Sequence, residues 1–370
     1  MSSHAAPDGA PLTARKPCAG MLGSSGVDES FSPARSPFTS RPRRCGIVLA
    51  AGDGTRLRPL IQRLRGKPLP KQYVSFVVTR SLLEHTFSRV ESILPPERVF
   101  TVVARDHLRY PEARKQLITR PKGRVVVQPA NRDTLPGLLL PLLQLRRLYP
   151  DSVVAVFPSD HYILEEERFM SFVTLAFQEV EQHPEQLILL GVEPDEPESE
   201  YGYLLPEQDL VTSAAEKAGP VRGFVEKPDP ARAEELIRSG ALWNTLVLVF
   251  HTASFLALVE RNIPGIMDGF LSIEEALGTP EENMMVEEAY RRMVPLNLSR
   301  DLLQALAPSQ PARLSVMAVR GVTWSDWGSE RRILGVAQPE PAWRKDLEHA
   351  TQGEGKGNED RRWQAVPAAG

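Results

Sequence analysis

Short runs of apolar residues alternate along this chain with longer segments of amphipathic helical pattern, and this alternation restricts the fold more than any other feature. The runs are apolar at nearly every position, as expected for strands that are covered on both faces. Two of the longer segments, residues 82–90 and 165–182, place apolar side chains on one stripe of a helix. The alternation predicts an α/β fold with a mostly parallel mixed central sheet flanked by helices. The predicted strands are residues 46–50, 99–103, 125–127, 153–157 and 187–190.

The second half of the chain has a less regular pattern. Asp229 and Pro230 predict the start of a helix that ends before Gly240. Residues 246–250 and 314–319 are further predicted strands, whereas residues 264–300 suggest helices without clear chemistry.

The two ends of the chain differ in composition from its middle. Residues 1–44 are rich in Ser, Pro, Ala and Gly, which predicts a disordered tail. The basic cluster at residues 41–44 is either solvated or an arm for an anionic partner. Residues 337–370 are polar and rich in Gly and charge, which predicts a flexible C-terminal tail, too short for a further domain. One ordered domain over residues 45–336 remains.

Charge and cysteine content argue against several classes of protein. The 370 residues carry a net charge of -3, which gives no general attraction to nucleic acid or to a membrane. Of the two cysteines, Cys18 and Cys45, the first lies in the predicted tail, so a disulfide framework is not expected. No apolar leader or spanning run occurs, since the leucine-rich residues 135–145 include two prolines. We expect a soluble, cytoplasmic protein with no nucleic-acid or membrane partner.

A glycine-rich turn follows the first predicted strand, in the sequence LAAGDGTRLRPL at residues 49–60. In a parallel sheet, ligands bind beyond the carboxyl ends of the strands. Gly52 and Gly54 let backbone N–H groups approach an anion closely. Residues 54–72 contain no acidic residue. The turn and its cations suggest a polyphosphate site, and those cations are Arg56, Arg58, Arg63, Arg65, Lys67 and Lys71.

Two familiar phosphate-binding motifs do not match this turn. Leu57 stands where the dinucleotide fingerprint needs its third glycine, and no Gly-Lys-Ser/Thr of a P-loop follows. Taken alone, the turn and the charge run are also compatible with an ordinary solvated face.

Two aspartates that each follow a predicted strand are candidate metal ligands. Asp160 directly follows residues 153–157, and Asp326 lies in the sequence WSDWG after residues 314–319. Two carboxylates beside a polyphosphate suggest Mg²⁺, which is commonly held by one or two carboxylates plus substrate phosphates. The alternative is that each aspartate caps a helix or a turn.

Eight motifs in the same order along the chain resemble those of the sugar-1-phosphate nucleotidyltransferases, and among these the mannose-1-phosphate guanylyltransferases most. The resemblance covers about residues 45–336 and is far more specific than any single motif. The motifs are residues 49–60, 70–71, 128–136, 158–161, 201–203, 224–228, 243–244 and 324–328.

The resemblance implies a Rossmann-like (GT-A-like) nucleotidyltransferase fold and a reaction in which a sugar 1-phosphate attacks the α-phosphorus of a nucleoside triphosphate. It implies GTP and mannose 1-phosphate as substrates and Mg²⁺ as cofactor, and it leaves open whether the chain forms a homodimer. Arg56, Lys71 and Asp160 would be catalytic, and Asp160 and Asp326 would share the metal ion. The implied nucleotide-binding residues are Leu49, Ala51, Gly52, Gly54, Thr55, Gln128, Arg132 and Thr134.

The resemblance also implies a sugar-phosphate site in the second half of the chain. Gly202 would lie against the sugar ring, Glu226 and Asn244 would bind sugar hydroxyls, and Lys227 would pair with the sugar phosphate. Taken alone, the sequence Glu226-Lys227-Pro228 is equally typical of an exposed charged turn.

Five residues depart from the family's pattern. Asp53 replaces a glycine of the turn, Asp133 an asparagine and Leu135 an alanine, while Trp327 replaces a smaller residue. Leu246 stands where relatives carry glycine, so we expect a narrower sugar pocket or a different sugar.

Three functional readings therefore stay open at the level of sequence. The favoured one is a Mg²⁺-dependent sugar nucleotidyltransferase, of guanylyl or another base specificity. The second is a catalytically silent homologue that binds a nucleotide sugar and regulates a partner. The third, a nucleic-acid-binding module, lacks interleaved aromatic residues and a basic domain charge.

Overall fold

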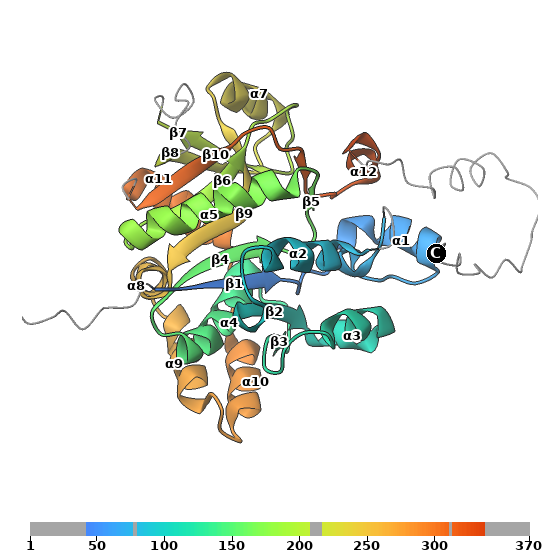
Figure 1. The fold of residues 1–370 in the computed structure, drawn as a ribbon, viewed down its shortest axis with the longest axis vertical. Helices are drawn as coiled ribbons and strands as arrows, with labels where there is room; N and C mark the ends of the chain where they lie inside the picture. Colours follow the sequence, from blue (N-terminus) through green and yellow to red (C-terminus); the bar gives the residue numbers. More distant parts are fainter. Residues whose placement is uncertain (1–41, 77–79, 208–216, 311–312, 337–370) are drawn as a thin grey trace, which may run out of the picture. The chain divides into compact units, whose positions relative to one another are not determined.

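The computed structural model describes residues 42–76, 80–207, 217–310 and 313–336. Among these residues, nine strands form one sheet in the order β3-β2-β1-β4-β9-β6-β10-β8-β7 (Figure 1). In the described part of this sheet, β8 and β9 run against the other seven strands. The prediction of a mostly parallel mixed sheet is therefore confirmed. The strands are β1 (Arg43–Leu49), β2 (Val99–Ala104), β3 (Val125–Gln128), β4 (Ser152–Pro158), β6 (Leu187–Val192), β7 (Gly202–Pro206), β8 (Ala218–Glu226), β9 (Leu242–His251) and β10 (Leu314–Val319).

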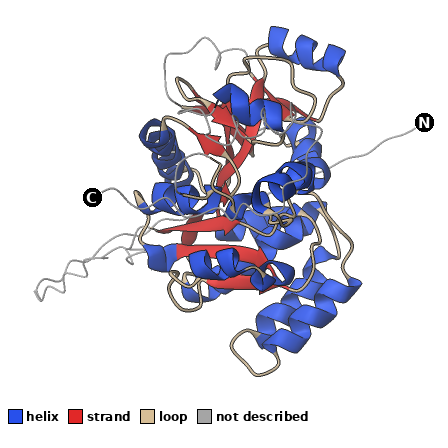
Figure 2. Ribbon diagram, turned by 90° about the vertical axis from the view of Figure 1, so that its right-hand side faces the viewer, coloured by secondary structure: helices blue, strands red, loops and turns tan. Residues whose placement is uncertain are grey.

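Helices cover both faces of this sheet, and Figure 2 shows them on its two sides. Successive residues of one strand enter opposite cores: Val48 of β1 packs with helices α2 and α5, while Ile47 packs with α4 and α8 to α10. This explains why the strands are apolar at successive positions. The helices are α1 (Arg58–Arg65), α2 (Leu82–Glu91), α3 (Pro111–Leu117), α4 (Thr134–Leu148), α5 (Glu166–Gln182), α7 (Pro230–Arg238), α8 (Thr252–Asn262), α9 (Ile266–Ala276), α10 (Glu282–Arg292), α11 (Gln304–Ser309) and α12 (Glu330–Val336).

The first strand begins at Arg43, two residues before the predicted start of the domain. The reason is a partly buried partner: Nε and Nη2 of Arg44 donate to the two carboxylate oxygens of Glu181, at 2.6 and 2.9 Å. The Arg44 guanidinium also lies 5.3 Å from the centre of the Phe177 ring. Arg44 is thus part of the fold and not of a free basic arm. Of the predicted tails at residues 1–44 and 337–370, residues 1–41 and 337–370 lie outside the described residues.

Sequence patterns miss part of the second half of the sheet. Strands β7 and β8 pair antiparallel, and β9 begins four residues before the predicted residue 246. The leucine-rich residues 135–145 form helix α4, which contains Pro141 in its interior. In the described part of the chain, no helix combines the length and the apolar character that crossing a membrane requires.

Candidate active site

The glycine-rich turn follows the carboxyl end of β1, and the buried side-chain amide of Gln72 holds it in place. Nε2 of Gln72 donates to the carbonyl oxygens of Ala50 and Gly52, at 2.9 Å each. Gln72 is 2% exposed, in the short 3₁₀ helix Lys71–Tyr73. Gly52 is exposed, and a β-carbon there would meet no atom within 4 Å. The peptide groups on the outer side of the turn are therefore open to a ligand. No sequence motif had singled out Gln72.

Gly54 is required at its position for two independent reasons. Its φ of 57° lies in the left-handed region, which residues with a side chain rarely adopt. A β-carbon there would also lie 3.1 Å from the backbone nitrogen of Lys71. The glycine thus brings the turn directly against the lysine.

Lys71 joins three distant segments at one point. Its side chain is 6% exposed, and Nζ lies 3.0 Å from Oδ2 of Asp160. Nζ also donates to the backbone oxygen of Asp326 at 2.5 Å. A cavity of about 200 Å³ opens beside it. Its lining is Gly54, Thr55, Arg56, Leu57, Lys71, Asp160 and Gly328.

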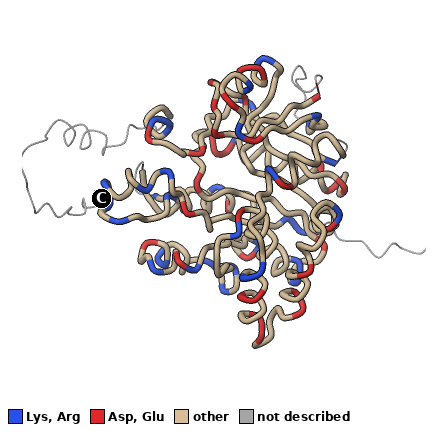
Figure 3. Tube along the Cα trace, turned by 180° about the vertical axis from the view of Figure 1, so that it is seen from behind, with Lys and Arg blue, Asp and Glu red and all other residues tan. Residues whose placement is uncertain are grey.

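The cations between residues 56 and 71 are mostly committed to acidic residues from elsewhere in the chain, and Figure 3 shows basic and acidic segments interspersed along the trace. Arg56 and Lys71 line the small cavity, and the other cations of the run do not. The partners are Glu200 and Asp326 for Arg56, Asp53 for Arg58, Glu330 for Arg63, the Ser75 carbonyl for Arg65, Glu112 for Lys67 and Asp160 for Lys71.

Asp53, the acidic residue in the turn, is drawn away from the cavity. Nδ2 of Asn131 donates to its Oδ2 at 3.1 Å, and Arg58 and His107 each lie 3.8 Å from Oδ1. Asp53 is not among the residues that line the cavity. The negative charge that this residue adds to the turn is thus compensated locally.

Asp326 is the most heavily engaged carboxylate of the site. Oδ2 accepts from Nη2 of Arg56 at 2.9 Å. Oδ1 accepts from the hydroxyl of Tyr201 at 3.1 Å, from the backbone nitrogen of Gly328 at 2.8 Å and from Nη1 of Arg332. Burial opposes its ionisation, but the charges of Lys71, Arg332 and Arg56 outweigh burial and hold the pKa of Asp326 below its usual value. Asp326 is therefore an ionised acceptor for four donors.

Asp160 is more open. Burial opposes its ionisation as well, but Lys71 and then His161 outweigh that effect, so the pKa of Asp160 is lowered. Its side chain is 31% exposed, and Oδ1 lies 3.6 Å from Nε2 of His161, too far for a hydrogen bond. Burial lowers the pKa of His161 to about 4, so this imidazole is neutral at pH 7.

The two predicted metal ligands thus differ in how well they fit Mg²⁺. Asp160 lines the small cavity, and its Oδ1 is 3.6 Å from Nε2 of His161, whereas both oxygens of Asp326 accept from protein donors. Among the described residues, no group of three or more His, Cys, Asp or Glu could hold a metal ion. Since Mg²⁺ is commonly held by one or two carboxylates together with substrate phosphates, the site fits an ion that arrives with a nucleotide and binds Asp160.

The predicted sugar residues Gly202, Glu226 and Asn244 lie together. Gly202 pairs with Glu226 across β7 and β8, and a β-carbon at Gly202 would lie 2.7 Å from Oε2 of Glu226 and 3.5 Å from Cβ of Asn244. Burial raises the pKa of Glu226, while the nearby charge of Lys227 lowers it by less. Oδ1 of Asn244 accepts from the backbone nitrogen of Leu246 at 2.9 Å. The structure thus brings these three residues together, and their role toward a sugar stays a prediction.

All the non-glycine residues with positive φ in the described part of the chain lie in or next to predicted motifs. Leu246 has a φ of 54°, which explains why glycine suits this position in relatives. Each such residue costs about 1–3 kcal/mol, and such strain concentrates at functional sites. The others are Asp133 (69°), Lys227 (49°) and Trp327 (43°).

The predicted base-binding residues are engaged in holding the chain together. Nε of Arg132 donates to the carbonyl oxygen of Tyr290 at the end of α10, at 2.7 Å. The hydroxyl of Thr134 accepts from the backbone nitrogen of Leu298 at 2.8 Å. Gln128 is 1% exposed and its Oε1 has no hydrogen-bond partner among the described residues. None of these three lines the small cavity, and neither do Leu49, which ends β1, and the buried Ala51.

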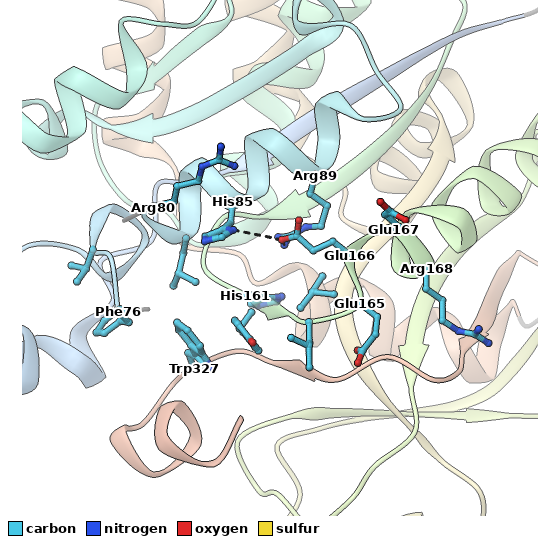
Figure 4. A pocket seen from close by; sticks show the side chains of 15 residues that line it. Phe76, Arg80, His85, Arg89, His161, Glu165, Glu166, Glu167, Arg168 and Trp327 are labelled. Atoms are coloured by element: carbon cyan, nitrogen blue, oxygen red, sulfur yellow. Dashed lines mark hydrogen bonds and ion pairs between the residues drawn. The ribbon is translucent and has the colours of Figure 1, made fainter. Parts of the chain in front are cut away.

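A larger cavity of about 710 Å³ lies next to this site, between α2, the start of α5 and Trp327 (Figure 4). His85 and Glu166 face one another in it, with 3.8 Å between Nδ1 and Oε1. It shares none of the predicted site residues and touches only their chain neighbours His161 and Trp327. The small cavity is the better candidate for the reaction because the glycine turn, Lys71 and Asp160 all reach it.

The fold and this site define an α/β protein with a small polar cavity at the carboxyl end of a mostly parallel sheet, where ligands commonly bind. Comparison with known families identifies the class more closely. Residues 45–338 match the family described as nucleotidyl transferase, and the chain belongs to this family. The resemblance inferred from the eight motifs is confirmed at this level.

Curated relatives cover part of this chain and carry further sequence of their own. The xanthan biosynthesis protein XanB of Xanthomonas campestris pv. campestris (strain B100) is 32% identical over 225 residues, 60% of this chain and 45% of the relative. A mannose-1-phosphate guanylyltransferase of Escherichia coli (strain K12) is 27% identical over 297 residues, 76% of this chain and 57% of the relative. The chain thus spans about half the length of these relatives.

Solved structures show the same fold. One described as a mannose-1-phosphate geranyltransferase from Thermus thermophilus has a TM-score of 0.66 and 28% identity, covering 81% of this chain and 80% of the other. One described as a mannose-6-phosphate isomerase from Helicobacter pylori has a TM-score of 0.58 and 21% identity, covering 76% of this chain and 99% of the other. The second similarity concerns the fold alone.

Proposed function

We propose that this chain catalyses Mg²⁺-dependent transfer of a nucleotidyl group from GTP to mannose 1-phosphate, giving GDP-mannose and pyrophosphate. The observation that carries the proposal is the meeting of the glycine turn at Gly54, the buried Lys71 and the ionised Asp160 at one small cavity. The choice of GTP and mannose follows relatives described as mannose-1-phosphate guanylyltransferases, such as that of E. coli.

For this reaction the protein has to position the two substrates and stabilise the negative charge of their phosphates. An oxygen of the sugar 1-phosphate attacks the α-phosphorus, the bond from that phosphorus to the β-bridging oxygen breaks, and pyrophosphate leaves with the electron pair. The second pKa of a phosphate monoester is about 6, so the nucleophile is already ionised near pH 7 and needs no general base. The turn would bind the triphosphate through backbone N–H groups, with Arg56 and Lys71 stabilising the charge that develops.

The metal ion would be held by Asp160 together with substrate phosphates. Bound there, Mg²⁺ would neutralise phosphate charge and align the reacting groups. Asp326 would become available to it only when Arg56 or Arg332 releases a carboxylate oxygen. Until then Asp326 orders Arg56 and Gly328 on the cavity wall.

The cluster of Gly202, Glu226 and Asn244 would bind the sugar. Lys227 would pair with the sugar phosphate. Because residue 202 is glycine, the Glu226 carboxylate can lie against the strand backbone, where a β-carbon would be 2.7 Å from its Oε2. The side chain of Leu246 would narrow this pocket.

Pyrophosphate release tests the proposal directly. The purified chain is assayed with Mg²⁺ across five nucleoside triphosphates and a panel of sugar 1-phosphates. Asp160→Asn is the test variant, and Asp151→Asn is its control because Asp151 adjoins the opposite end of the same strand, where it pairs with His251. Release with GTP and mannose 1-phosphate, lost only in Asp160→Asn, supports the proposal. Release with another pair retains the reaction and changes the substrates.

A catalytically silent homologue that binds a nucleotide sugar is the second candidate. The observation that favours it is the internal pairing of Arg56 and Asp326, which occupies groups that catalysis would use. Absence of pyrophosphate release across the whole panel, with a GDP-sugar still bound, would make this the better function.

A further inference from the structure

An acidic segment at residues 196–200, between β6 and β7, pairs with three arginines that are far away in sequence. Glu196 lies 2.8 Å from Nη2 of Arg331, and Glu198 lies 3.1 Å from Nε of Arg332, both on α12. Glu200 accepts from Nη1 of Arg56 at 2.9 Å. The acidic segment thus connects α12 to the arginine that follows the glycine turn.

The conformation of the acidic segment is set by its own hydrogen bonds. The hydroxyl of Tyr203 accepts from the backbone nitrogen of Glu198 at 2.9 Å and donates to its carbonyl oxygen at 3.1 Å. The backbone nitrogen of Glu200 donates to Oε1 of Glu198 at 3.0 Å. Glu200 is therefore presented to Arg56 by an ordered backbone.

Arg56 uses its two terminal nitrogens on two different carboxylates. Nη1 donates to Glu200 and Nη2 donates to Oδ2 of Asp326, both at 2.9 Å. Carboxylate and phosphate oxygens bind a guanidinium through the same planar N–H groups, so they compete for it. Arg56 lines the small cavity, and a β-carbon at Gly328 would lie 2.8 Å from its guanidinium. The guanidinium is therefore confined on that side.

We propose that Glu200 is an internal competitor of the substrate phosphates for Arg56, so that a nucleoside triphosphate binds by replacing the Glu200 carboxylate on Nη1. This inference rests on the proposed function for the identity of the substrate, and only on the geometry of Arg56 for the competition itself. Glu200 then sets the affinity of the site for triphosphates and keeps Arg56 paired when no substrate is bound.

The expected gain in triphosphate affinity depends on how exposed the pair of Arg56 and Glu200 is. The side chains of Arg56 and Glu200 are each 47% exposed, so their pair is a solvent-screened one. Removing such a competitor is expected to tighten binding by about two- to five-fold at low salt. The gain should shrink as ionic strength rises, since salt screens exposed pairs.

The test is calorimetric titration of the full chain with inorganic tripolyphosphate and, separately, with GTP. Glu200→Gln keeps the shape of the side chain and removes its charge. Glu196→Gln is the matched control, because it removes a charge from the same segment without touching Arg56. We expect tighter binding in Glu200→Gln by the factor above, loss of that difference in high salt, and unchanged binding in Glu196→Gln.

Unchanged or weaker binding in a Glu200→Gln protein whose melting temperature matches the wild type would overturn the inference, as would equal tightening in both variants. Glu200→Ser serves as a second variant if the first is unstable. No binding of tripolyphosphate by wild type or variant would overturn it too. The proposed function is tested separately by turnover: binding that follows the expected pattern without pyrophosphate release overturns only that function.

Discussion

Arg332 donates a hydrogen bond through Nη1 to Oδ1 of Asp326, and the two side chains are only 9% and 12% exposed. The same guanidinium contacts Glu198 and lies 4.7 Å from the centre of the Tyr201 ring. An arginine on the last described helix therefore neutralises the carboxylate that the family resemblance assigns to Mg²⁺. Under the proposed function, the Mg²⁺ concentration that the reaction needs should depend on that pair.

Replacing Arg332 by Gln should lower the Mg²⁺ concentration needed for half-maximal turnover. A hydrogen bond to a charged group contributes about 1.5–3 kcal/mol, so loss of the Arg332 donor should lower that concentration by about tenfold or more. Tyr201 and Gly328 still donate to the same oxygen in the variant. A magnesium titration of pyrophosphate release measures it, with Mn²⁺ binding as a second readout. Arg331→Gln is the control, since Arg331 is 70% exposed and pairs with Glu196. A higher magnesium requirement in Arg332→Gln would mean that Arg332 positions Asp326 for the metal.

Lys71→Met should reduce turnover by about 10²–10³-fold, the usual loss when a buried donor to developing charge is removed. Nζ of Lys71 is the cation that Asp160 and the Asp326 carbonyl share, so its loss also leaves both acceptors without it. Steady-state kinetics and a melting curve separate the catalytic effect from unfolding. Lys67→Met is the control: its ammonium pairs with Glu112 and is 40% exposed. Similar losses in both variants would contradict a special role for Lys71.

Gly54→Ala should weaken triphosphate binding as well as stability. Left-handed backbone costs a residue with a side chain about 1–2 kcal/mol, and the new β-carbon would also press on the backbone nitrogen of Lys71. Gly66→Ala separates the two effects, because Gly66 has a φ of 70° with no atom within 4 Å of the added carbon. Urea unfolding should show a cost in both variants, whereas tripolyphosphate binding should fall only in Gly54→Ala. If both variants bound tripolyphosphate equally well, the contact between residue 54 and Lys71 would not matter for binding.

Some of these relationships can be predicted from sequence and others cannot. Residues 153–157 and 187–190 are predictable strands because both faces of each strand are covered and both must be apolar. Strand β7 is short and interrupted by a register shift near Pro206, so it has no clear period. The pairing of Glu200 with Arg56 spans 144 residues and depends on packing that no local pattern encodes.

The candidate site divides in the same way. The glycine turn, its cations and Asp160 follow predicted strands, and their motifs resemble one family, so the sequence predicts that they lie together. The structure brings Gly54, Lys71 and Asp160 to one cavity. Gln72 and Arg332 lie in no recognised motif. Their contacts, with the carbonyl of Ala50 and with Asp326, depend on how distant segments pack together. Arg132 and Thr134 were assigned to the nucleotide by position, yet their side chains hold residues 290 and 298.

Leu246→Gly should change the Michaelis constant for the sugar 1-phosphate and leave that for the nucleoside triphosphate unchanged. Leu246 adjoins Asn244 in β9, and glycine would relieve the strain of its φ of 54° while widening the pocket. Lost apolar contacts offset this relief, so stability should stay within about 1 kcal/mol of the wild type. Kinetics across the sugar panel measure the effect, with more sugars accepted by the variant. A change in the constant for the triphosphate alone would place Leu246 elsewhere in the site.

The pH dependence of kcat/KM should have an acid limb near pH 6 that belongs to the substrate. Lys71 and neighbouring charges lower the pKa values of Asp160 and Asp326 below their usual range, so both stay ionised from pH 8 to pH 5. Their stabilising effect is lost only as pH falls below about 4, the value in unfolded chains. Burial lowers the pKa of His161 to about 4, so its imidazole stays neutral over the same range.

The reacting group that titrates near pH 6 is the sugar phosphate, whose monoanion is the weaker nucleophile. The acid limb should therefore move to higher pH with a sugar 1-C-phosphonate, which has a higher second pKa than the phosphate. It should keep its position in the Glu196→Gln variant, which serves as the control. A limb that stays fixed when the sugar substrate is changed would assign the titration to the triphosphate or to the protein. In the protein, the partly buried carboxylate of Glu226, whose pKa burial raises, would be the first group to replace.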